Sequence, residues 1–412
     1  MSIWAKQKLG EVVDFIDGDR GTNYPSQGEF FPSGYCLFLS TRNVPNSRFS
    51  FEENLFISEE KDAELHKGKL QRGDYVLTTR GTVGNFAYYD RSVPYPNVRI
   101  NSGMVILRKK SEELNEKFFR YYLSSDSFSG QVKARVSGSA QPQLPIKDMI
   151  SMEIILPDLI TQTCIASILA SYDDLIENNE RRIKTLEEMA RRLYTEWFVK
   201  FKFPGHEKVK MVDSGTEFGM IPEGWRSGSM ADVFDNLRIS TQAGKHLMGR
   251  MYVPIEYLPR KSLVLQNFAD WKEAQSSLVL FEKGDILFGA MRPYFHKVSI
   301  APFAGVTRTT CFVLRPKEKY FKSFGALTAF SDRVVAFASG NTRGATIPYV
   351  VWDGALSNCP VVIPPSDLLN RFENIVETTL GQLAFLSLQN NRLVRMRGLL
   401  IPQLVTGKRQ VR

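Results

Sequence analysis

The feature that most constrains the fold of this 412-residue chain is an internal repeat with a period of about 200 residues. Arg72-Gly73-Asp74-Tyr75-Val76-Leu77 is echoed by Lys283-Gly284-Asp285-Ile286-Leu287-Phe288, and residues 102–108 are echoed by residues 309–315. Further echoes in the same order are Trp4-Ala5-Lys6-Gln7-Lys8-Leu9 with Trp225-Arg226-Ser227-Gly228-Ser229-Met230, Ser137-Gly138-Ser139 with Ser339-Gly340-Asn341, and Ile154-Ile155-Leu156-Pro157 with Val361-Val362-Ile363-Pro364. We therefore interpret the chain as two copies of one globular unit, each followed by a long helix.

Within each copy the residue pattern is typical of short strands. Apolar, β-branched and aromatic runs are separated by Gly, Pro, Asn and Asp, at residues 35–39, 75–79, 104–107, 278–281 and 311–314. A helical pattern occupies residues 116–123. We expect a unit with short helices and a curled mixed sheet, whose strand order the pattern does not define.

Two long segments carry heptad periodicity, with apolar residues spaced alternately by four and three positions. Asn179 and Asn390 fall on this seam, where a buried amide can fix the register of a coiled coil. The alternative is two amphipathic helices that pack separately on their domains. The seam residues, expected to form the coiled-coil and subunit interface, are Ile165, Leu169, Tyr172, Ile176, Asn179, Ile183, Leu186, Leu193 and Trp197 in the first helix, and Phe372, Val376, Leu383, Leu386, Asn390 and Leu393 in the second.

The predicted fold class is α+β, with two pseudo-repeated α/β domains separated by two long helices that form an antiparallel coiled coil. A helix of about forty residues is roughly 60 Å long, so antiparallel pairing would hold the two domains apart like a ruler. The predicted boundaries are residues 1–156 for domain 1, 157–203 for helix 1, 204–222 for a linker, 223–363 for domain 2 and 364–412 for helix 2.

Composition excludes some classes of protein. No apolar run approaches the roughly 18 residues of a membrane span, and Met1–Lys8 lacks the pattern of a signal peptide, so we expect a cytoplasmic protein without membrane contact. The 4 cysteines and 4 histidines are scattered without metal-ligand spacing, and we expect no metal. With 53 Lys and Arg against 44 Asp and Glu, the net charge of +9 favours, without proving, a polyanionic partner.

Motifs of catalysis are missing from the sequence. There is no phosphate-binding loop, no GxSxG, no HExxH and no motif of an amino-methyltransferase. Asp158, which could suggest a nuclease carboxylate, is better explained as a helix-start residue. We therefore predict a protein with no catalytic residue and no cofactor of its own.

Several loops combine Arg, Asn, Thr and Tyr in a way that suits DNA. Arg can donate two hydrogen bonds to guanine, Asn can recognise adenine, and hydroxyl groups can position phosphates. Arg80 and Arg292 both follow the shared Gly-Asp strand. The predicted DNA-binding residues are Arg20, Thr22, Asn23, Tyr24, Thr79, Arg80, Thr82, Ser139, Gln141, Arg292, Tyr294, Arg308, Asn341 and Arg343. Residues 389–412 hold six basic residues and no acid, for which a solvated helix end is the simpler explanation.

Several motifs point to a known family. They are Gly219-Met220-Ile221-Pro222-Glu223-Gly224-Trp225 at the start of the second unit, the two Gly-Asp strands, the Leu156-Pro157 and Ile363-Pro364 junctions, and Leu399-Leu400-Ile401-Pro402-Gln403-Leu404-Val405-Thr406-Gly407 at the end. Together with the duplication, they resemble the DNA-specificity (S) subunit of type I restriction-modification systems over essentially the whole chain.

The resemblance implies a division of labour between subunits. Each recognition domain would read one half of a bipartite site in double-stranded DNA, and the helices would set the gap. The helices would also dock two methyltransferase (M) subunits, which flip and N6-methylate adenine with S-adenosylmethionine. Restriction (R) subunits would add ATP-driven cleavage. The alternatives are a stand-alone DNA-binding regulator, an enzyme with fused catalytic motifs, and a coiled-coil adaptor that does not bind DNA.

Overall fold

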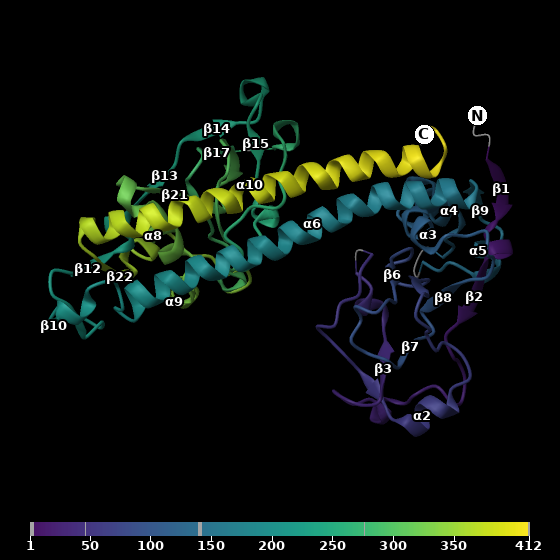
Figure 1. Cartoon of the computed structure of the whole chain (residues 1–412). Coiled ribbons are helices and arrows are strands. Elements are labelled where there is room, and N and C mark those ends of the chain that lie inside the picture. Colours follow the sequence, from purple (N-terminus) through teal and green to yellow (C-terminus); the bar gives the residue numbers. More distant parts are fainter. Residues whose placement is uncertain (1–3, 46, 139–141, 276, 411–412) are drawn as a thin grey trace. The chain divides into compact units, whose positions relative to one another are not determined.

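The structure is a computed structural model that describes residues 4–45, 47–138, 142–275 and 277–410. The chain divides into two compact units: unit 1 comprises Met1–Asp173 with Arg395–Arg412, and unit 2 comprises Asp174–Val394. Each unit therefore contains one domain of strands and short helices, together with a stretch of both long helices (Figure 1).

Unit 1 is built on an antiparallel four-stranded sheet of order β2-β8-β5-β6. A three-stranded sheet, β4-β3-β7, contains a parallel β3–β7 pair, and β1 pairs with β9. The bounds are β1 Ala5–Lys8, α1 Leu9–Val12, β2 Val13–Asp17, β3 Cys36–Leu39, β4 Phe56–Ile57, α2 Glu59–Glu64, β5 Tyr75–Thr78, β6 Phe86–Tyr88, β7 Val98–Ile100, β8 Met104–Lys109, α3 Glu116–Leu123, α4 Asp126–Arg135, α5 Ile146–Ile150 and β9 Glu153–Leu156.

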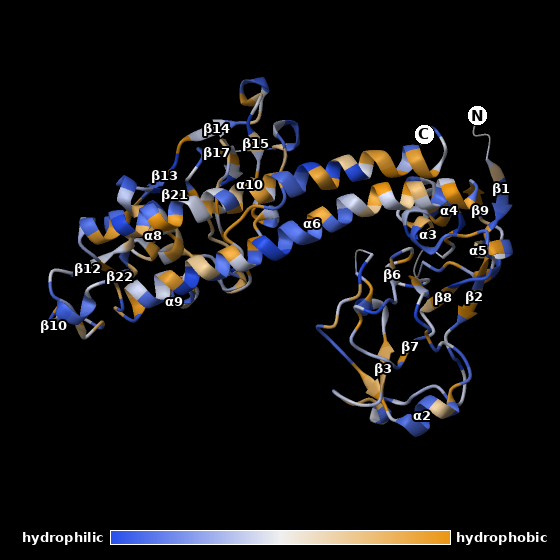
Figure 2. Cartoon of the chain, viewed as in Figure 1, coloured by the Kyte–Doolittle hydropathy of each residue, from blue (hydrophilic) through white to orange (hydrophobic). Residues whose placement is uncertain are grey.

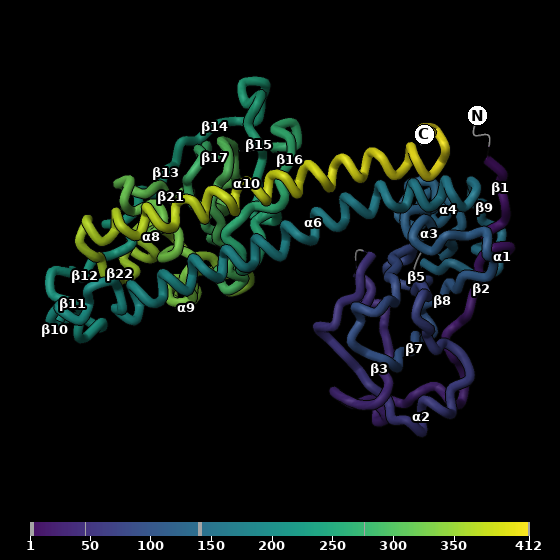
Figure 3. The backbone as a smooth tube through the Cα atoms, in the orientation of Figure 1, coloured from purple at the N-terminus to yellow at the C-terminus, as the bar shows by residue number. Residues whose placement is uncertain are grey.

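Unit 2 repeats this plan with additions. Its antiparallel sheet β13-β21-β18-β19 corresponds to β2-β8-β5-β6, and its β12–β22 pair corresponds to β1–β9. A mixed five-stranded sheet, β14-β17-β20-β15-β16, and a β10–β11 hairpin complete it (Figure 3). The bounds are β10 Met211–Asp213, β11 Met220–Pro222, β12 Arg226–Ser229, α7 Met230–Val233, β13 Phe234–Leu237, β14 Ser240–Gln242, β15 Met251–Tyr252, β16 Ala269–Asp270, β17 Ser277–Phe281, β18 Ile286–Gly289, β19 Val298–Ile300, β20 Gly305–Arg308, β21 Cys311–Pro316, α8 Lys322–Ala329, α9 Asp332–Gly340 and β22 Pro360–Ile363.

The Gly-Asp motif has the same structural role in both units. The carboxylate of Asp74 is buried and accepts two hydrogen bonds from Arg108, Nε at 2.8 Å and Nη2 at 2.7 Å. In unit 2, Asp285 accepts from Arg315 Nε at 2.7 Å and Nη2 at 2.8 Å. Because a buried charge must be paired, this two-point ion pair explains why the aspartate precedes the central strand and the arginine ends its neighbour.

One echo read from the sequence is in the wrong register. Ser339 and Gly340 are the last residues of helix α9, whereas Ser137 follows α4 and pairs with Gln143. The residue that makes the same pair in unit 2 is Arg343, with Tyr349. The glycine that follows each has a positive φ, 90° at position 138 and 85° at position 344. Backbone pairing, and not the shared Ser-Gly letters, defines the equivalent residues.

Two long helices run through the units. Helix α6, Leu159–Tyr194, continues as a π-helical turn at Thr195–Val199, and α10 spans Ser366–Val405. The side chain of Asp158 accepts a hydrogen bond from the Thr161 N–H at 2.9 Å and so caps the start of α6. This observation agrees with the helix-start role expected for Asp158.

The apolar stripe of each helix contacts the other helix and a domain at once. In unit 1, Ile165 and Leu169 share a core with Ile401 and Leu404 and with the side chains of α3 and α4. In unit 2, Ile183 packs with Leu383, Leu386 and Val264. The contacts move to higher residue numbers along α6, from Ile165 to Ile183, and to lower numbers along α10, from Ile401 to Leu383. The two helices therefore pair antiparallel.

Both interpretations of the heptads, a coiled-coil seam and helices packed on their domains, therefore hold in part. The same apolar stripe contacts the other helix and a domain. The predicted α+β fold with two repeated domains and an antiparallel helix pair is confirmed. Figure 2 shows that hydrophilic residues dominate the middle of α6, where the sequence from Asp173 to Arg182 is mostly charged or amide-bearing. Among the described residues, no helix has the length and apolar character needed to cross a membrane.

Candidate nucleic-acid interface

In unit 1, loops from distant parts of the sequence meet at the turn that precedes β8, residues 101–103. Arg20 Nη2 donates a hydrogen bond to the Ser102 carbonyl at 3.4 Å. From another loop, Arg80 N donates to the Gly103 carbonyl at 3.2 Å. Burial raises the pKa of Tyr24, and the Ser102 side chain, which lies near the Tyr24 hydroxyl, partly offsets this effect. The structure thus brings Arg20, Tyr24 and Arg80 together at one end of the four-stranded sheet.

The two arginines of this cluster, Arg20 and Arg80, differ in whether their guanidinium groups already have a partner. Within the described part of the chain, the Arg80 guanidinium has neither a hydrogen-bond nor an ion-pair partner. Arg20 is already paired with Asp17, at 3.2 Å between Nη2 and Oδ2. A phosphate or a base must displace Asp17 to bind Arg20, whereas Arg80 can bind directly. Thr22 and Thr82 are exposed beside these arginines.

Other predicted contact residues in unit 1 have roles inside the fold. The amide of Asn23 donates to the Glu64 carbonyl at 3.2 Å, and the ring of Tyr24 packs edge-on against Phe38, with centroids 5.7 Å apart. Thr79 is buried, and its main chain bonds Gly103. The side chains of Asn23 and Tyr24 and the main chain of Thr79 therefore hold the loops in place. Two more predicted residues, Ser139 and Gln141, lie outside the described residues.

In unit 2, the predicted arginines are exposed at loop positions. Arg292 has a left-handed backbone, with φ 48°, and leads into a 3-10 turn, Pro293–Phe295, that presents the exposed ring of Tyr294. Arg308 ends β20, and Arg343 follows α9. Asn341 instead donates to the Phe337 carbonyl at 2.9 Å and closes helix α9. Among the described residues, the guanidiniums of Arg292, Arg308 and Arg343 have neither a hydrogen-bond nor an ion-pair partner.

The backbone places Met291, not Arg292, at the position that Arg80 has in unit 1. Arg80 pairs with Gln143 across a β-bridge, and Met291 pairs with Tyr349 in the same way. The preceding amides also match, since Thr79 N donates to Gly103 O at 2.8 Å and Ala290 N donates to Thr310 O at 2.9 Å. The expected correspondence of Arg80 with Arg292 is therefore wrong by one residue.

The conformation of the backbone explains this offset. Arg292 occupies the place of Gly81, and both have positive φ, 48° and 70°. Counting from the shared aspartates would have given the correct register, since Arg80 and Met291 are each six positions beyond Asp74 and Asp285. Gln143 and Tyr349 are not among the residues predicted from the sequence, because their link to these loops is a cross-strand contact and not a motif.

Unit 2 has a cavity at this end of its sheet. Its volume is about 600 Å³, and its walls include Arg238, Met291, Thr310, Tyr349 and Trp352. Apolar side chains provide most of the remaining lining. The cavity adjoins the loops with the exposed arginines, so the interface combines positive charge with an apolar hollow.

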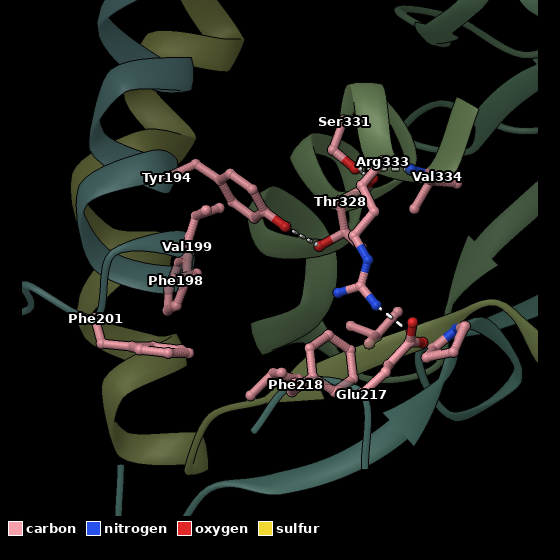
Figure 4. A pocket seen from close by; sticks show the side chains of 13 residues that line it. Tyr194, Phe198, Val199, Phe201, Glu217, Phe218, Thr328, Ser331, Arg333 and Val334 are labelled. Atoms are coloured by element: carbon pink, nitrogen blue, oxygen red, sulfur yellow. Dashed lines mark hydrogen bonds and ion pairs between the residues drawn. The ribbon is translucent and has the colours of Figure 1, made fainter. Parts of the chain in front are cut away.

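A second cavity of unit 2 lies elsewhere, between the end of α6, the linker and α9 (Figure 4). Its volume is about 440 Å³. Arg333 extends into it, but Glu217 neutralises the guanidinium at 3.2 Å, and the ring of Phe218 lies 4.0 Å from the guanidinium carbon. Tyr194 and Thr328 share a hydrogen bond across it at 3.0 Å. Because its polar groups are satisfied internally, we regard this cavity as a joint between elements.

The cysteines and histidines do not form a reactive centre. Among the described residues there is no group of three or more His, Cys, Asp or Glu side chains suited to a metal ion. Burial raises the pKa of the Cys36 and Cys359 thiols to about 12 and that of Cys311 to about 11, which disfavours the nucleophilic thiolate. Burial lowers the pKa of His296, whose ring bonds the Phe330 carbonyl.

The fold defines a class of protein: a duplicated chain whose two similar α+β domains are joined to paired long helices. Residues 1–188 match the family model described as the type I restriction modification DNA specificity domain. Over its whole length the chain is similar to specificity subunits of type I restriction-modification systems.

Individual relatives agree with this assignment. The chain is 24% identical, over 99% of its length and 94% of the relative's, to the type I restriction enzyme MjaIX specificity subunit of Methanocaldococcus jannaschii. It is 26% identical to the HindI specificity subunit of Haemophilus influenzae, over 52% of this chain and 45% of that one. The crystal structure of the S subunit from M. genitalium has a similar fold, with a TM-score of 0.58 at 15% identity, covering 98% of this chain and 96% of that one.

Proposed function

We propose that each domain of this specificity subunit, residues 1–156 and 223–363, reads one half of a bipartite DNA site. The observation that carries this proposal is the duplication itself, because the same Asp–Arg anchored sheet presents a loop cluster at the same end in each unit. Two similar DNA-binding domains suit the two halves of a bipartite site. The long helices, residues 157–203 and 364–412 with the linker 204–222, set the gap between the halves.

We call the loop-bearing end of each sheet the reading end: it carries Arg80 in unit 1 and Arg292, Arg308 and Arg343 in unit 2. The positive charges there support contact with DNA. Arg80, Arg292, Arg308 and Arg343 have no hydrogen-bond or ion-pair partner among the described residues, so they are available to phosphates or to guanine edges without breaking an existing pair. The net charge of +9 supplies long-range attraction to the duplex. Binding should therefore weaken steeply with salt, as it does for proteins that neutralise phosphates.

The helices expose apolar side chains at equivalent positions of the repeat. Ile168 on α6 and Ile375 on α10 are 37% and 51% exposed, and Met189 and Met396 are 58% and 49% exposed. Both pairs are 207 positions apart in sequence, as are Pro157 and Pro364, which precede the two helices. Exposed apolar side chains on a helix favour a protein partner. Because the surface is present twice, we propose that it docks two copies of the same methyltransferase subunit.

The chemistry then belongs to the partners. The docked M subunits methylate adenine N6 with S-adenosylmethionine, and R subunits join the complex for cleavage, while this chain contributes the choice of sequence. It needs no cofactor of its own for that task. We expect it to act in the cytoplasm, where the chromosomal DNA is accessible.

The deciding experiment is single-molecule sequencing of host DNA, scored for N6-methyladenine, with the gene intact, deleted and restored. We expect a bipartite motif that disappears on deletion and returns on restoration. Methylation that persists unchanged in the deletion strain would contradict the proposal. A gel-shift assay of the purified chain alone tests the rival role of stand-alone regulator, which requires tight sequence-specific binding without an M subunit.

A further inference from the structure

A row of three residues lies across adjacent strands at the reading end of unit 1. Gln143 is the middle member, pairing with Arg80 on one side and with Ser137 on the other. The main chains of Ser137 and Gln143 exchange two hydrogen bonds, at 3.0 and 2.9 Å. Side chains directly opposite each other on paired strands point to the same face, so Arg80, Gln143 and Ser137 present one polar strip.

Unit 2 has the same row with different side chains. Tyr349 is the middle member and pairs with Met291 and with Arg343. Arg343 and Tyr349 exchange main-chain hydrogen bonds at 2.7 and 2.9 Å. The arginine therefore stands at opposite ends of the two rows, as Arg80 in unit 1 and as Arg343 in unit 2. The thioether of Met291 and the ring of Tyr349 occupy the other two positions in unit 2.

The unit 2 row is exposed enough to meet a ligand. The Tyr349 side chain is 42% exposed, and Arg343 is exposed. Met291 is partly exposed and lines the apolar cavity of about 600 Å³ together with Tyr349. A single exposed aromatic residue needs no explanation, but a thioether and a ring side by side at the mouth of a hollow offer a surface for an apolar group.

We infer that these two rows determine base specificity, and that they do so by different chemistry. In unit 1, Arg80 and Gln143 recognise base edges through hydrogen bonds. In unit 2, Met291 and Tyr349 contact the C5 methyl group of a thymine, and Arg343 supplies the polar contact beside it. This inference rests on the proposed function and names the residues and the chemical group by which each half-site is chosen.

The chemistry of the major groove supports this assignment. Arginine recognises guanine O6 and N7, and glutamine recognises adenine N6 and N7. The thymine methyl group is the one apolar feature that the groove displays, and apolar side chains recognise it. A Met–Tyr pair has one donor, the Tyr349 hydroxyl, and lacks the two-point pairing that arginine makes with guanine and glutamine with adenine. Its thioether and ring complement a methyl group in shape and polarity.

The test compares duplexes that contain the methylated motif with thymine or with deoxyuridine at each position in turn. Deoxyuridine keeps the base pair and removes only the methyl group. The half-site that unit 2 reads is the one whose recognition changes in Tyr349→Ala. When one particular thymine of that half-site is replaced by deoxyuridine, the full chain in complex with its methyltransferase subunit should bind the duplex about fourfold more weakly. This is the effect expected for one buried carbon. With Met291→Ala or Tyr349→Ala, the two duplexes should bind equally at that position.

Matched controls separate recognition from folding. Met248→Ala removes a 79% exposed methionine of the same unit outside the row and should keep the fourfold preference. Arg80→Ala and Gln143→Ala should alter the other half-site and also keep that preference. If the wild-type complex shows no bipartite motif, the proposed function itself fails. If the motif is present but every thymine can be replaced without effect, or the preference survives in both Met291→Ala and Tyr349→Ala, the inference alone is overturned.

Discussion

At the scale of single residues, the arginines at the reading end differ by their internal partners. Arg80 has none within the described residues, and Arg20 is paired with Asp17. We predict that Arg80→Ala weakens DNA binding by about 1–3 kcal/mol and relaxes one half-site, as expected for an arginine that reads a base. Arg20→Ala should cost less, because Asp17 competes with DNA for that guanidinium.

Salt-matched binding titrations and the methylation motif measure both effects. Lys6→Ala removes one positive charge from β1 of the same unit, where the amine is paired with Glu153 at 3.0 Å, and serves as the control. For unit 2, Arg292→Gly removes the side chain without strain, because φ is 48° at this position. Unaltered specificity in Arg80→Ala and in Arg292→Gly would exclude both arginines as base readers.

The same residues show how far sequence reasoning reaches. The Gly-Asp strands could be predicted, because apolar runs and turn residues are local signals. The equivalence of Arg80 with Met291 could not be read from residue identity, because it is defined by bridges to Gln143 and Tyr349, more than fifty positions away along the chain. Likewise, the internal bonds of Asn23 and Asn341 depend on neighbours that no motif reveals.

A buried carboxylate gives a prediction about pH. Burial raises the pKa of Glu187 above its usual 4.5, although Oε1 accepts from Ser262 Oγ at 2.8 Å and from Leu263 N at 2.7 Å. A raised pKa means that the ionised form costs stability. This cost is present above the folded-state pKa and disappears as the pH falls below 4.5.

We predict that Glu187→Gln raises the Tm of the chain by a few degrees at pH 7, with the difference vanishing near pH 4. Glutamine keeps the carbonyl oxygen that accepts both hydrogen bonds, so only the charge is removed. Calorimetry at the two pH values measures the effect. Glu188→Gln, an exposed neighbour on α6, is the control and should change little. A lower Tm for Glu187→Gln at pH 7 would contradict this account.

At the scale of elements, the helix seam contains a polar layer. Asn179 Nδ2 donates to Asn390 Oδ1 at 2.8 Å and to Gln389 Oε1 at 3.1 Å, and Asn390 Nδ2 donates to the Ile176 carbonyl at 3.2 Å. We predict that Asn179→Ala destabilises the chain by about 1–3 kcal/mol, because it leaves the partly buried acceptors of Gln389 and Asn390 without their donor. The double change Asn179→Leu with Asn390→Leu should be nearly neutral. Denaturant titration compares them, and equal losses for both variants would argue against a paired layer.

The exposed apolar positions of the two helices lead to a prediction about stoichiometry. We predict that Ile168→Asp and Ile375→Asp each lower the number of bound M subunits from two to one, and that the double variant binds none. A charge at the centre of an apolar contact loses both the burial and the solvation of the carboxylate. Native mass spectrometry of the copurified complex counts the subunits.

Asn178→Asp adds the same charge at another exposed position of α6 and should leave two M subunits bound. Two bound M subunits in both isoleucine variants would place the docking surface elsewhere. The heptads predicted two long helices with an apolar stripe. They left open whether the stripe packs on the other helix or on a domain, because an apolar period does not say which surface covers it.

At the scale of the whole molecule, the proposed role of the helices means that their length sets the number of base pairs between the two half-sites. One heptad added to each helix, between Asp173 and Asp174 in α6 and between Val394 and Arg395 in α10, preserves the phase of the seam. Seven residues lengthen a helix by about 10 Å, which corresponds to about three base pairs at 3.4 Å each. We therefore predict a methylated motif with both half-sites unchanged and a gap about three base pairs longer.

Sequencing of N6-methyladenine in cells that carry the lengthened chain reads both half-sites and the gap together. Adding seven flexible residues to the linker 204–222 is the control, because this change does not lengthen the paired helices and should leave the gap as it was. A gap that is unchanged after the paired insertion, with methylation intact, would show that the spacing is set by the M subunits or by the DNA. A longer gap in the paired variant alone means that helix length is the quantity this protein uses to choose its sites.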